Sequence, residues 1–157
     1  MPMGLVDSHC HLNFDPLGKE LDAVLQRARE AGVTHMLCVA VTVEKLPEVI
    51  SIAESYPSVF ASVGVHPDHA DDTDPTVDEL VALADHPRVV AIGETGLDYF
   101  RLKGDLEWQR ERFRRHIRAA RETGKPLIIH TREAAEDTIR ILREESAQEV
   151  GGVMHCF

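Results

Sequence analysis

The sequence predicts an α/β fold, a (β/α)8 TIM barrel of which about six of the eight strands are present. The main observation is an alternation, along the whole chain, between short runs rich in Val and Ile and longer amphipathic stretches. The short runs contain few polar residues, which is typical of strands buried on both faces of a parallel sheet. The first strand-to-helix turn, residues 7–11, contains no glycine and the chain has no P-loop, so a barrel is favoured over a nucleotide-binding open sheet.

Six apolar runs are the predicted strands, and they are residues 5–9, 33–41, 59–65, 89–93, 126–130 and 152–157. The amphipathic stretches between them are the predicted helices, residues 17–28, 43–55, 77–84, 106–120 and 134–145. In the first helix Leu17, Leu21 and Leu25 recur at helical spacing, and Gly32 follows as a stop. The fourth helix ends before Gly124 in the same way. This order requires right-handed crossovers and a parallel sheet covered by helices.

Length and composition are typical of one soluble globular domain, with 157 residues, 43% of them hydrophobic and 28% charged. No apolar run is long enough to span a membrane, and residues 1–5 lack the pattern of a signal peptide. We therefore expect a cytoplasmic protein without a membrane partner. The net charge of -10 argues against broad, charge-driven attraction to nucleic acid. Residues 99–125 are an exception, because they carry nine Lys or Arg against four acids, a pattern typical of a solvated helix face.

Ionisable side chains end five of the six predicted strands. His9 and His11 end the first strand with one residue between them, so both side chains point to the same side. The others are His66 after the third strand, Glu94 after the fourth, His130 after the fifth and His155 after the sixth. Active sites of barrels lie at the carboxyl ends of the strands, so these side chains are expected to converge.

A divalent metal is the simplest reason for such a cluster. Uncompensated buried polar groups cost roughly 1–3 kcal/mol each, and a metal offsets this cost by binding their lone pairs. Glu94 has two oxygens and can bridge two ions about 3.5–4 Å apart. We predict two ions, Mg, Mn or Zn, one held by His9 and His11, the other by His130 and His155, and both by Glu94. For each residue the alternative is a satisfied core or loop side chain. The remaining histidines are interpreted as ordinary surface or capping residues: His35, His69, His86 and His116.

Five segments resemble the successive signatures of the TatD family of metal-dependent deoxyribonucleases. They are Asp-Ser-His-Cys-His-Leu at 7–12, Val-Gly-Val-His-Pro at 63–67, Ile-Gly-Glu-Thr-Gly-Leu-Asp-Tyr at 92–99, Pro-Leu-Ile-Ile-His-Thr-Arg at 126–132 and Gly-Val-Met-His-Cys-Phe at 152–157. The resemblance implies a barrel metallohydrolase acting on DNA phosphodiesters, a 3′-to-5′ exonuclease preferring single strands; some relatives hydrolyse mischarged D-aminoacyl-tRNA. It implies metal ligands at the five residues assigned above, and it implies that His66 and Arg132 face the substrate phosphate.

The predicted reaction is hydrolysis of a DNA phosphodiester at single strands or 3′ ends, with Glu94, His66 and Arg132 as the catalytic residues. Arg132 can orient a phosphate with two parallel hydrogen bonds. Other roles stay open: His66 as an ordinary turn residue, and Arg132 as a partner of Glu133 or Glu136. An amidohydrolase-type enzyme cleaving C–N or ester bonds is the first rival function. An inactive truncated fragment is the second.

The resemblance departs from the family pattern at the end of the chain. The family continues into two further strands, one of which carries a metal-binding aspartate, whereas this chain ends at Phe157 on the sixth strand. We therefore expect a single domain, residues 1–157, that lacks its C-terminal strands. Asp7 and Asp98 are the nearest acids, and Asp98 is expected to support a ligand instead of binding metal. Unpaired first and sixth strands are expected to make the chain poorly stable, prone to self-association and at most weakly active.

Overall fold

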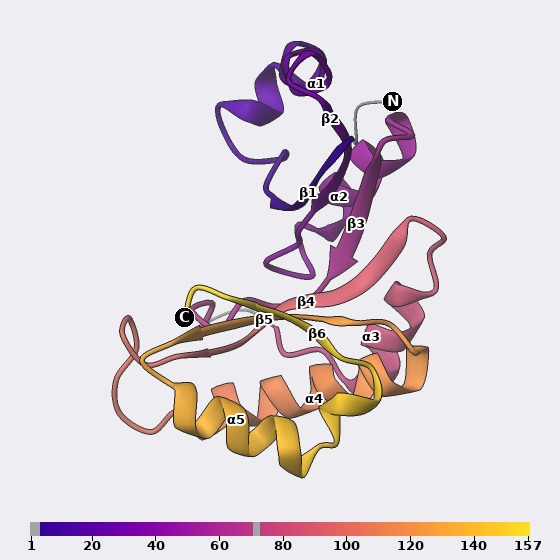
Figure 1. Cartoon of the computed structure of the whole chain (residues 1–157). Helices are drawn as coiled ribbons and strands as arrows, with labels where there is room; N and C mark the ends of the chain where they lie inside the picture. Colours follow the sequence, from indigo (N-terminus) through magenta and orange to yellow (C-terminus); the bar gives the residue numbers. More distant parts are fainter. Residues whose placement is uncertain (1–3, 71–72) are drawn as a thin grey trace.

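Six parallel strands form one curled sheet in which each strand pairs with the next along the chain (Figure 1). The structure, a computed structural model, describes residues 4–70 and 73–157, so the first three residues of the N-terminal stretch examined for a signal peptide lie outside it. The strands are β1 (Leu5–Cys10), β2 (Val33–Cys38), β3 (Val59–Val63), β4 (Val89–Asp98), β5 (Leu127–Arg132) and β6 (Gly152–His155).

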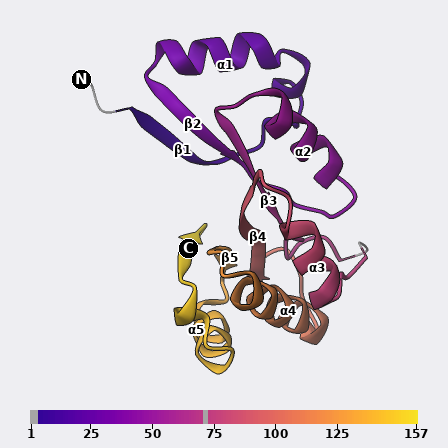
Figure 2. The same ribbon diagram turned by 90° about the vertical axis from the view of Figure 1, so that its right-hand side faces the viewer.

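The five predicted helices are all present and lie outside the curl of the sheet (Figures 1 and 2). They are α1 (Leu21–Glu30), α2 (Leu46–Ser55), α3 (Val77–Ala84), α4 (Glu107–Thr123) and α5 (Ala135–Glu144). The first is shorter than predicted, because Leu17–Lys19 forms a separate 3-10 turn, as does Ala147–Glu149 near the C-terminus. None of the helices in the described ranges has the length and apolarity needed to cross a membrane. Strands inside and helices outside make the half-barrel that the sequence predicts.

The core lies between the sheet and the helices. Each helix contributes at least one fully buried apolar side chain, namely Leu25, Val49, Leu80, Phe113 and Ile141. Burying a side chain of this size stabilises a fold by about 1.5–3 kcal/mol. Helix α3 begins with a capping box, in which the Thr76 hydroxyl accepts from Glu79 N and the Glu79 carboxylate accepts from Thr76 N. The amphipathic pattern therefore places each helix, and local capping sets where α3 starts.

Strand β4 is longer than predicted, and this difference matters for the site. The apolar run indicated an end at Gly93, but pairing with β5 continues as far as Asp98 opposite Arg132. The polar side chains in this extension, Glu94, Thr95 and Asp98, are buried, and the carboxylates of Glu94 and Asp98 contact histidines there. Gly96 has φ 137°, and a Cβ there would overlap the carbonyl oxygen of His130 on β5. Only glycine allows the two strands to approach so closely.

The prediction that all strands are buried on both faces is wrong for the first and last strands. Leu5 and Val6 on β1 are 60% and 64% exposed, and Val153 on β6 is 59% exposed. Within residues 4–70 and 73–157, β1 pairs only with β2 and β6 only with β5. Each strand therefore has one open edge and an uncovered apolar face.

These open edges are expected to make the 157-residue chain self-associate. Exposed edge strands with apolar side chains pair readily with other chains. Size-exclusion chromatography with light scattering should show a mass above that of the monomer, and Val153→Lys should shift the chain toward monomer because charged side chains block edge pairing. A wild-type chain that elutes as a monomer at every concentration would contradict this prediction.

Candidate metal centre

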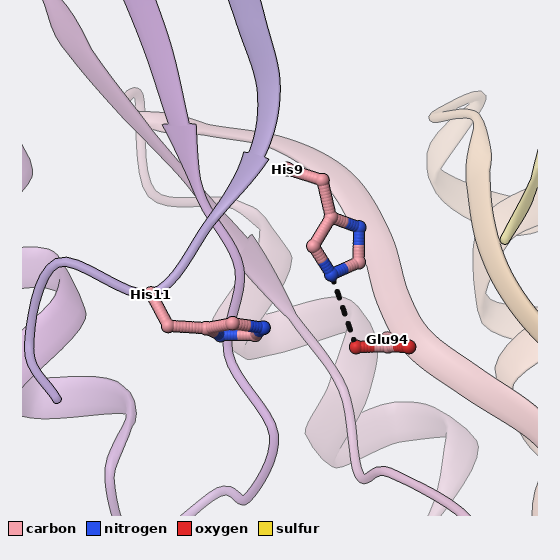
Figure 3. Close-up of side chains that lie close together, drawn as sticks. All are labelled: His9, His11 and Glu94. Carbon is pink, nitrogen blue, oxygen red and sulfur yellow. Dashed lines mark ion pairs between the residues drawn. The ribbon is translucent and has the colours of Figure 1, made fainter. Parts of the chain in front are cut away.

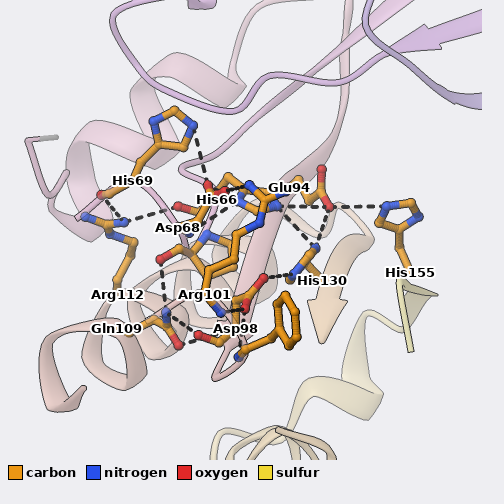
Figure 4. A network of polar contacts seen from close by, with 12 residues as sticks. His66, Asp68, His69, Glu94, Asp98, Arg101, Gln109, Arg112, His130 and His155 are labelled. Atoms are coloured by element: carbon orange, nitrogen blue, oxygen red, sulfur yellow. Dashed lines mark hydrogen bonds and ion pairs between the residues drawn. The ribbon is translucent and has the colours of Figure 1, made fainter. Parts of the chain in front are cut away.

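Glu94 lies at the centre of the candidate site and is almost completely buried on β4. One carboxylate oxygen, Oε2, lies 3.2 Å from His9 Nε2 at the end of β1 (Figure 3). The other, Oε1, faces three imidazoles from β5, β6 and the loop after β3 (Figure 4). Its distances are 3.2 Å to His130 Nδ1, 3.5 Å to His155 Nε2 and 3.6 Å to His66 Nε2. The strand ends therefore bring histidines to both oxygens of one carboxylate.

Among the described residues, two groups of three have potential ligand atoms that all lie within 4.8 Å of one another. One is His9, His11 and Glu94, and the other is His66, Glu94 and His130. His155 belongs to neither group, although its ring stacks on that of His9 with the centroids 4.1 Å apart. The structure thus brings all six predicted site residues of the strand ends together, and it groups His66, where the sequence placed His155, with Glu94 and His130.

The donor atoms at the site fit a divalent ion. His9 Nε2 is buried and has no hydrogen-bond partner among the described residues. Leaving such an atom unsatisfied costs roughly 1–3 kcal/mol, a cost that a bound cation removes. His11 Nδ1 donates to the Val39 carbonyl at 3.0 Å, which leaves the Nε2 lone pair free for a metal. Imidazoles with a carboxylate suit Zn and Mn, and the carboxylate also suits Mg.

Carboxylates orient two of the histidines. His130 Nε2 lies 3.0 Å from Asp98 Oδ2, so Nδ1 is the atom turned toward Glu94. His66 Nδ1 lies 2.5 Å from Asp68 Oδ1, which turns Nε2 toward the same oxygen of Glu94. Such pairs fix the ring and raise its basicity as a ligand. Asp98 thus contacts His130, whereas Asp7 is exposed and accepts from the backbone of His9.

The electrostatics favour an ionised Glu94. Burial raises the pKa of Glu94, but the close contacts with His130 and His9 and the nearby His66 outweigh it, so the pKa lies well below its usual value. Burial lowers the pKa of His130, yet its contacts with Glu94 and Asp98 raise the pKa overall. Burial lowers the pKa of His66 and of His11. The centre therefore combines an ionised Glu94 with His66 and His11 rings that burial keeps neutral, and these are the forms that bind metal.

A cavity of about 350 Å³ opens beside Glu94, and Arg101 and Arg132 line it together with four of the clustered histidines, His11, His66, His130 and His155. The Arg132 guanidinium lies 3.8 Å above the ring of Phe100. It makes no hydrogen bond or ion pair with any described residue, so the alternative in which it pairs with Glu133 or Glu136 is not realised. In contrast, Arg101 pairs with Asp68 at 2.6 Å. Arg132 is thus an unpaired cation on an aromatic platform at the mouth of the site.

The interpretation of His116 as a surface or capping residue is wrong. Its side chain is fully buried in α4, where Nε2 accepts from Val65 N at 3.0 Å and Nδ1 donates to the Arg112 carbonyl at 2.8 Å. The sequence held a signal, since His116 falls on the same helical stripe as Phe113 and Ile117. Arg112, counted with the solvated basic face, is also buried. In agreement with the prediction, His35 is exposed and His86 contacts Glu54.

The fold is a half-barrel, and histidines surround one buried carboxylate at the carboxyl ends of its strands. Fold and site together define the class: a barrel protein with a site of the metal-binding type. Residues 6–157 match the family model described as TatD related DNase. The chain is 43% identical to an uncharacterized metal-dependent hydrolase, YcfH of Escherichia coli K12, over 99% of this chain and 59% of the relative. The chain belongs to the TatD family.

Two further relatives extend the comparison. A protein of Erwinia tasmaniensis named 3'-5' ssDNA/RNA exonuclease TatD is 36% identical over 98% of this chain and 60% of its own length. The crystal structure of YJJV, a TatD homologue from Escherichia coli, superposes with a TM-score of 0.87 at 31% identity, covering 98% of this chain and 60% of that one. The chain thus spans about 60% of the length of the relatives it matches.

Proposed function

We propose that this chain forms the main part of a divalent-metal-dependent hydrolase that cleaves phosphodiester bonds of DNA, with single strands or 3′ ends as substrates. The observation that carries the proposal is the position of Glu94, whose two oxygens face histidines from different strands. The exonuclease name of the Erwinia tasmaniensis relative supports the choice of substrate. The activity would depend on metal and would take place in the cavity above Glu94.

Each residue at the site has a distinct proposed role. Glu94 would hold both ions, His9 and His11 would hold the first, and His130 and His155 would hold the second. When bound, the two ions lower the pKa of the attacking water and offset charge on the phosphoryl oxygens. Asp98 keeps His130 in its ligand orientation.

His66 and Arg132 are proposed to bind the phosphate. Asp68 Oδ1, 2.5 Å from His66 Nδ1, turns His66 Nε2 toward the cavity, where a protonated ring can donate to a phosphate oxygen. Arg132 can supply two parallel hydrogen bonds, and its position on Phe100 holds the guanidinium without using its N–H groups.

The experiment that tests the proposal offers several substrates to the purified chain. With Mn²⁺ or Mg²⁺, 5′-labelled single-stranded DNA should shorten stepwise from its 3′ end, and EDTA should abolish the products. A duplex, a D-aminoacyl ester and an amide serve as the rival substrates. Preferential cleavage of the ester or amide would favour the amidohydrolase-type function. A chain that binds metal but cleaves none of the four would overturn the proposal in favour of an inactive fragment.

The exchange of Arg132 for lysine is expected to lower kcat/KM for single-stranded DNA by about 10–100-fold. Lysine keeps the charge but loses the paired hydrogen bonds and the stacking on Phe100, and hydrogen bonds to charged groups contribute about 1.5–3 kcal/mol. Arg140→Lys is the matched control, because Arg140 lies on the outer helix α5 and its ion-pair partners among the described residues are Asp137 and Glu144. Equal effects of the two substitutions would argue against phosphate binding by Arg132.

Two alanine variants test which histidine on the His130 side of Glu94 binds metal and which contacts the substrate. His155→Ala should lose one of two bound ions. His66→Ala should retain both ions, with the second bound more weakly because His66 Nε2 lies 3.2 Å from His130 Nδ1, and should lose about 100-fold in turnover, in the range of general acid-base or positioning groups. Metal content of the dialysed proteins, together with kcat, decides between the roles. The reverse result, one ion lost in His66→Ala and none in His155→Ala, would exchange the two assignments.

A further inference from the structure

One side of helix α4 presents three buried polar side chains to the carboxyl ends of β3 and β4. Gln109, Arg112 and His116 are spaced by three and four residues, so they lie on one face of the helix. They are 0%, 2% and 0% exposed. Buried polar groups are costly unless they are hydrogen-bonded, so this face requires specific partners.

The first set of partners is the backbone that follows β3 and carries His66. His116 Nε2 accepts from Val65 N at 3.0 Å, and Gln109 Nε2 donates to the Pro67 carbonyl at 3.0 Å. Arg112 Nη1 donates to the carbonyls of His66, at 3.3 Å, and His69, at 2.8 Å (Figure 4). Helix α4 therefore fixes the backbone on both sides of His66.

The second partner is the end of β4. Gln109 Oε1 accepts from Asp98 N at 3.0 Å, and Asp98 in turn holds His130 Nε2 (Figure 4). A single amide thus joins the segment that carries His66 to the strand end that supports His130. Among the described residues, none of these three side chains contacts the segment with His9 and His11, so their influence is confined to one half of the centre.

We propose that Gln109, Arg112 and His116 are positioning residues for the His66 and His130 half of the metal centre, and that they set the affinity of the second ion without affecting the first. The inference rests on the proposed two-ion function. Its physical basis is that groups orienting a ligand change metal affinity by about 10–100-fold, although they do not touch the metal. A purely structural role would instead change the stability of the whole chain and both ions together.

The test is a calorimetric titration of the metal-free chain with Mn²⁺, combined with thermal unfolding of the same samples. Arg112→Met removes the contacts to the carbonyls of His66 and His69. Arg114→Met is the matched control, because Arg114 lies on the same helix but pairs with Glu144 and Glu145. Gln109→Glu keeps an acceptor for Asp98 N and loses the donor to Pro67, and it serves if Arg112→Met does not fold.

We expect two ions in the wild type, and in Arg112→Met and Gln109→Glu an unchanged first ion with the second bound at least about tenfold more weakly. Arg114→Met should match the wild type. Arg112→Lys, which can still donate to a carbonyl, should restore part of the lost affinity. Equal weakening of both ions, or no change in either, would overturn the inference. A wild-type chain that binds no more than one ion would overturn the proposed function, and this inference with it.

Discussion

Glu94→Gln is expected to release bound metal and to lower kcat/KM for single-stranded DNA by about 1,000-fold or more. Glutamine has nearly the same shape, so the buried site on β4 keeps its packing. The variant loses the anionic oxygens that face His9 on one side and His130 on the other. Without that charge, the repulsion between two neighbouring cations is no longer offset. Loss of metal assistance corresponds to several kcal/mol of transition-state stabilisation.

Metal content after dialysis is the direct measurement for Glu94→Gln, with kcat/KM as the second. Glu133→Gln is the control, because Glu133 is exposed, lies just beyond β5 and, within residues 4–70 and 73–157, has Lys103 as its one ion-pair partner. It should keep the metal content and activity of the wild type. A Glu94→Gln chain with an unchanged number of bound ions would show that the carboxylate does not bridge them.

The convergence of the site could be predicted because it depends only on topology. Parallel strands joined by right-handed crossovers place their carboxyl ends on one side, so residues as far apart as His9 and His155 had to meet. Their rings do stack in the structure. Hydrophobic periodicity was sufficient to find the six strands and the five α-helices of the described residues, because burial of one helix face is what holds each helix to the sheet.

The contacts that orient the site residues could not be predicted from hydrophobic periodicity. The end of β4 appeared polar and therefore irregular, yet Thr95 and Asp98 are buried in a paired strand. The sequence also did not indicate which of His66 and His155 lies with Glu94 and His130, since that depends on which ring is oriented by a carboxylate. Asp68, two residues beyond His66, provides it. Contacts made by side chains across elements decide these questions, and no periodicity encodes them.

The metal-free chain is expected to lose stability steeply between about pH 6.5 and pH 4 because of His116. Burial is the main cause, with the neighbouring charges of Arg112 and Arg115 adding to it, and it lowers the pKa of His116 from 6.5 to about 4. Geometry requires the neutral ring as well, because Nε2 must accept from Val65 N while Nδ1 donates. Above about pH 6.5 folded and unfolded chains both hold a neutral ring, and the full stability is present. As the pH falls, the unfolded chain takes up the proton first, so about 3 kcal/mol is lost in total.

Urea unfolding in EDTA at several pH values isolates this contribution when wild type is compared with His116→Gln, whose side-chain oxygen can still accept from Val65 N. At pH 7 the wild type should be the more stable protein, and its advantage should shrink by about 2 kcal/mol by pH 5 because only the wild type carries this histidine. His35→Gln, which removes an exposed imidazole from β2, controls for the loss of one histidine and should keep the acid sensitivity of the wild type. A difference in the free energy of unfolding between wild type and His116→Gln that stays constant across this range would mean that His116 accepts a proton in the folded chain. The hydrogen bond from Val65 N could not then be the contact that holds the backbone before His66.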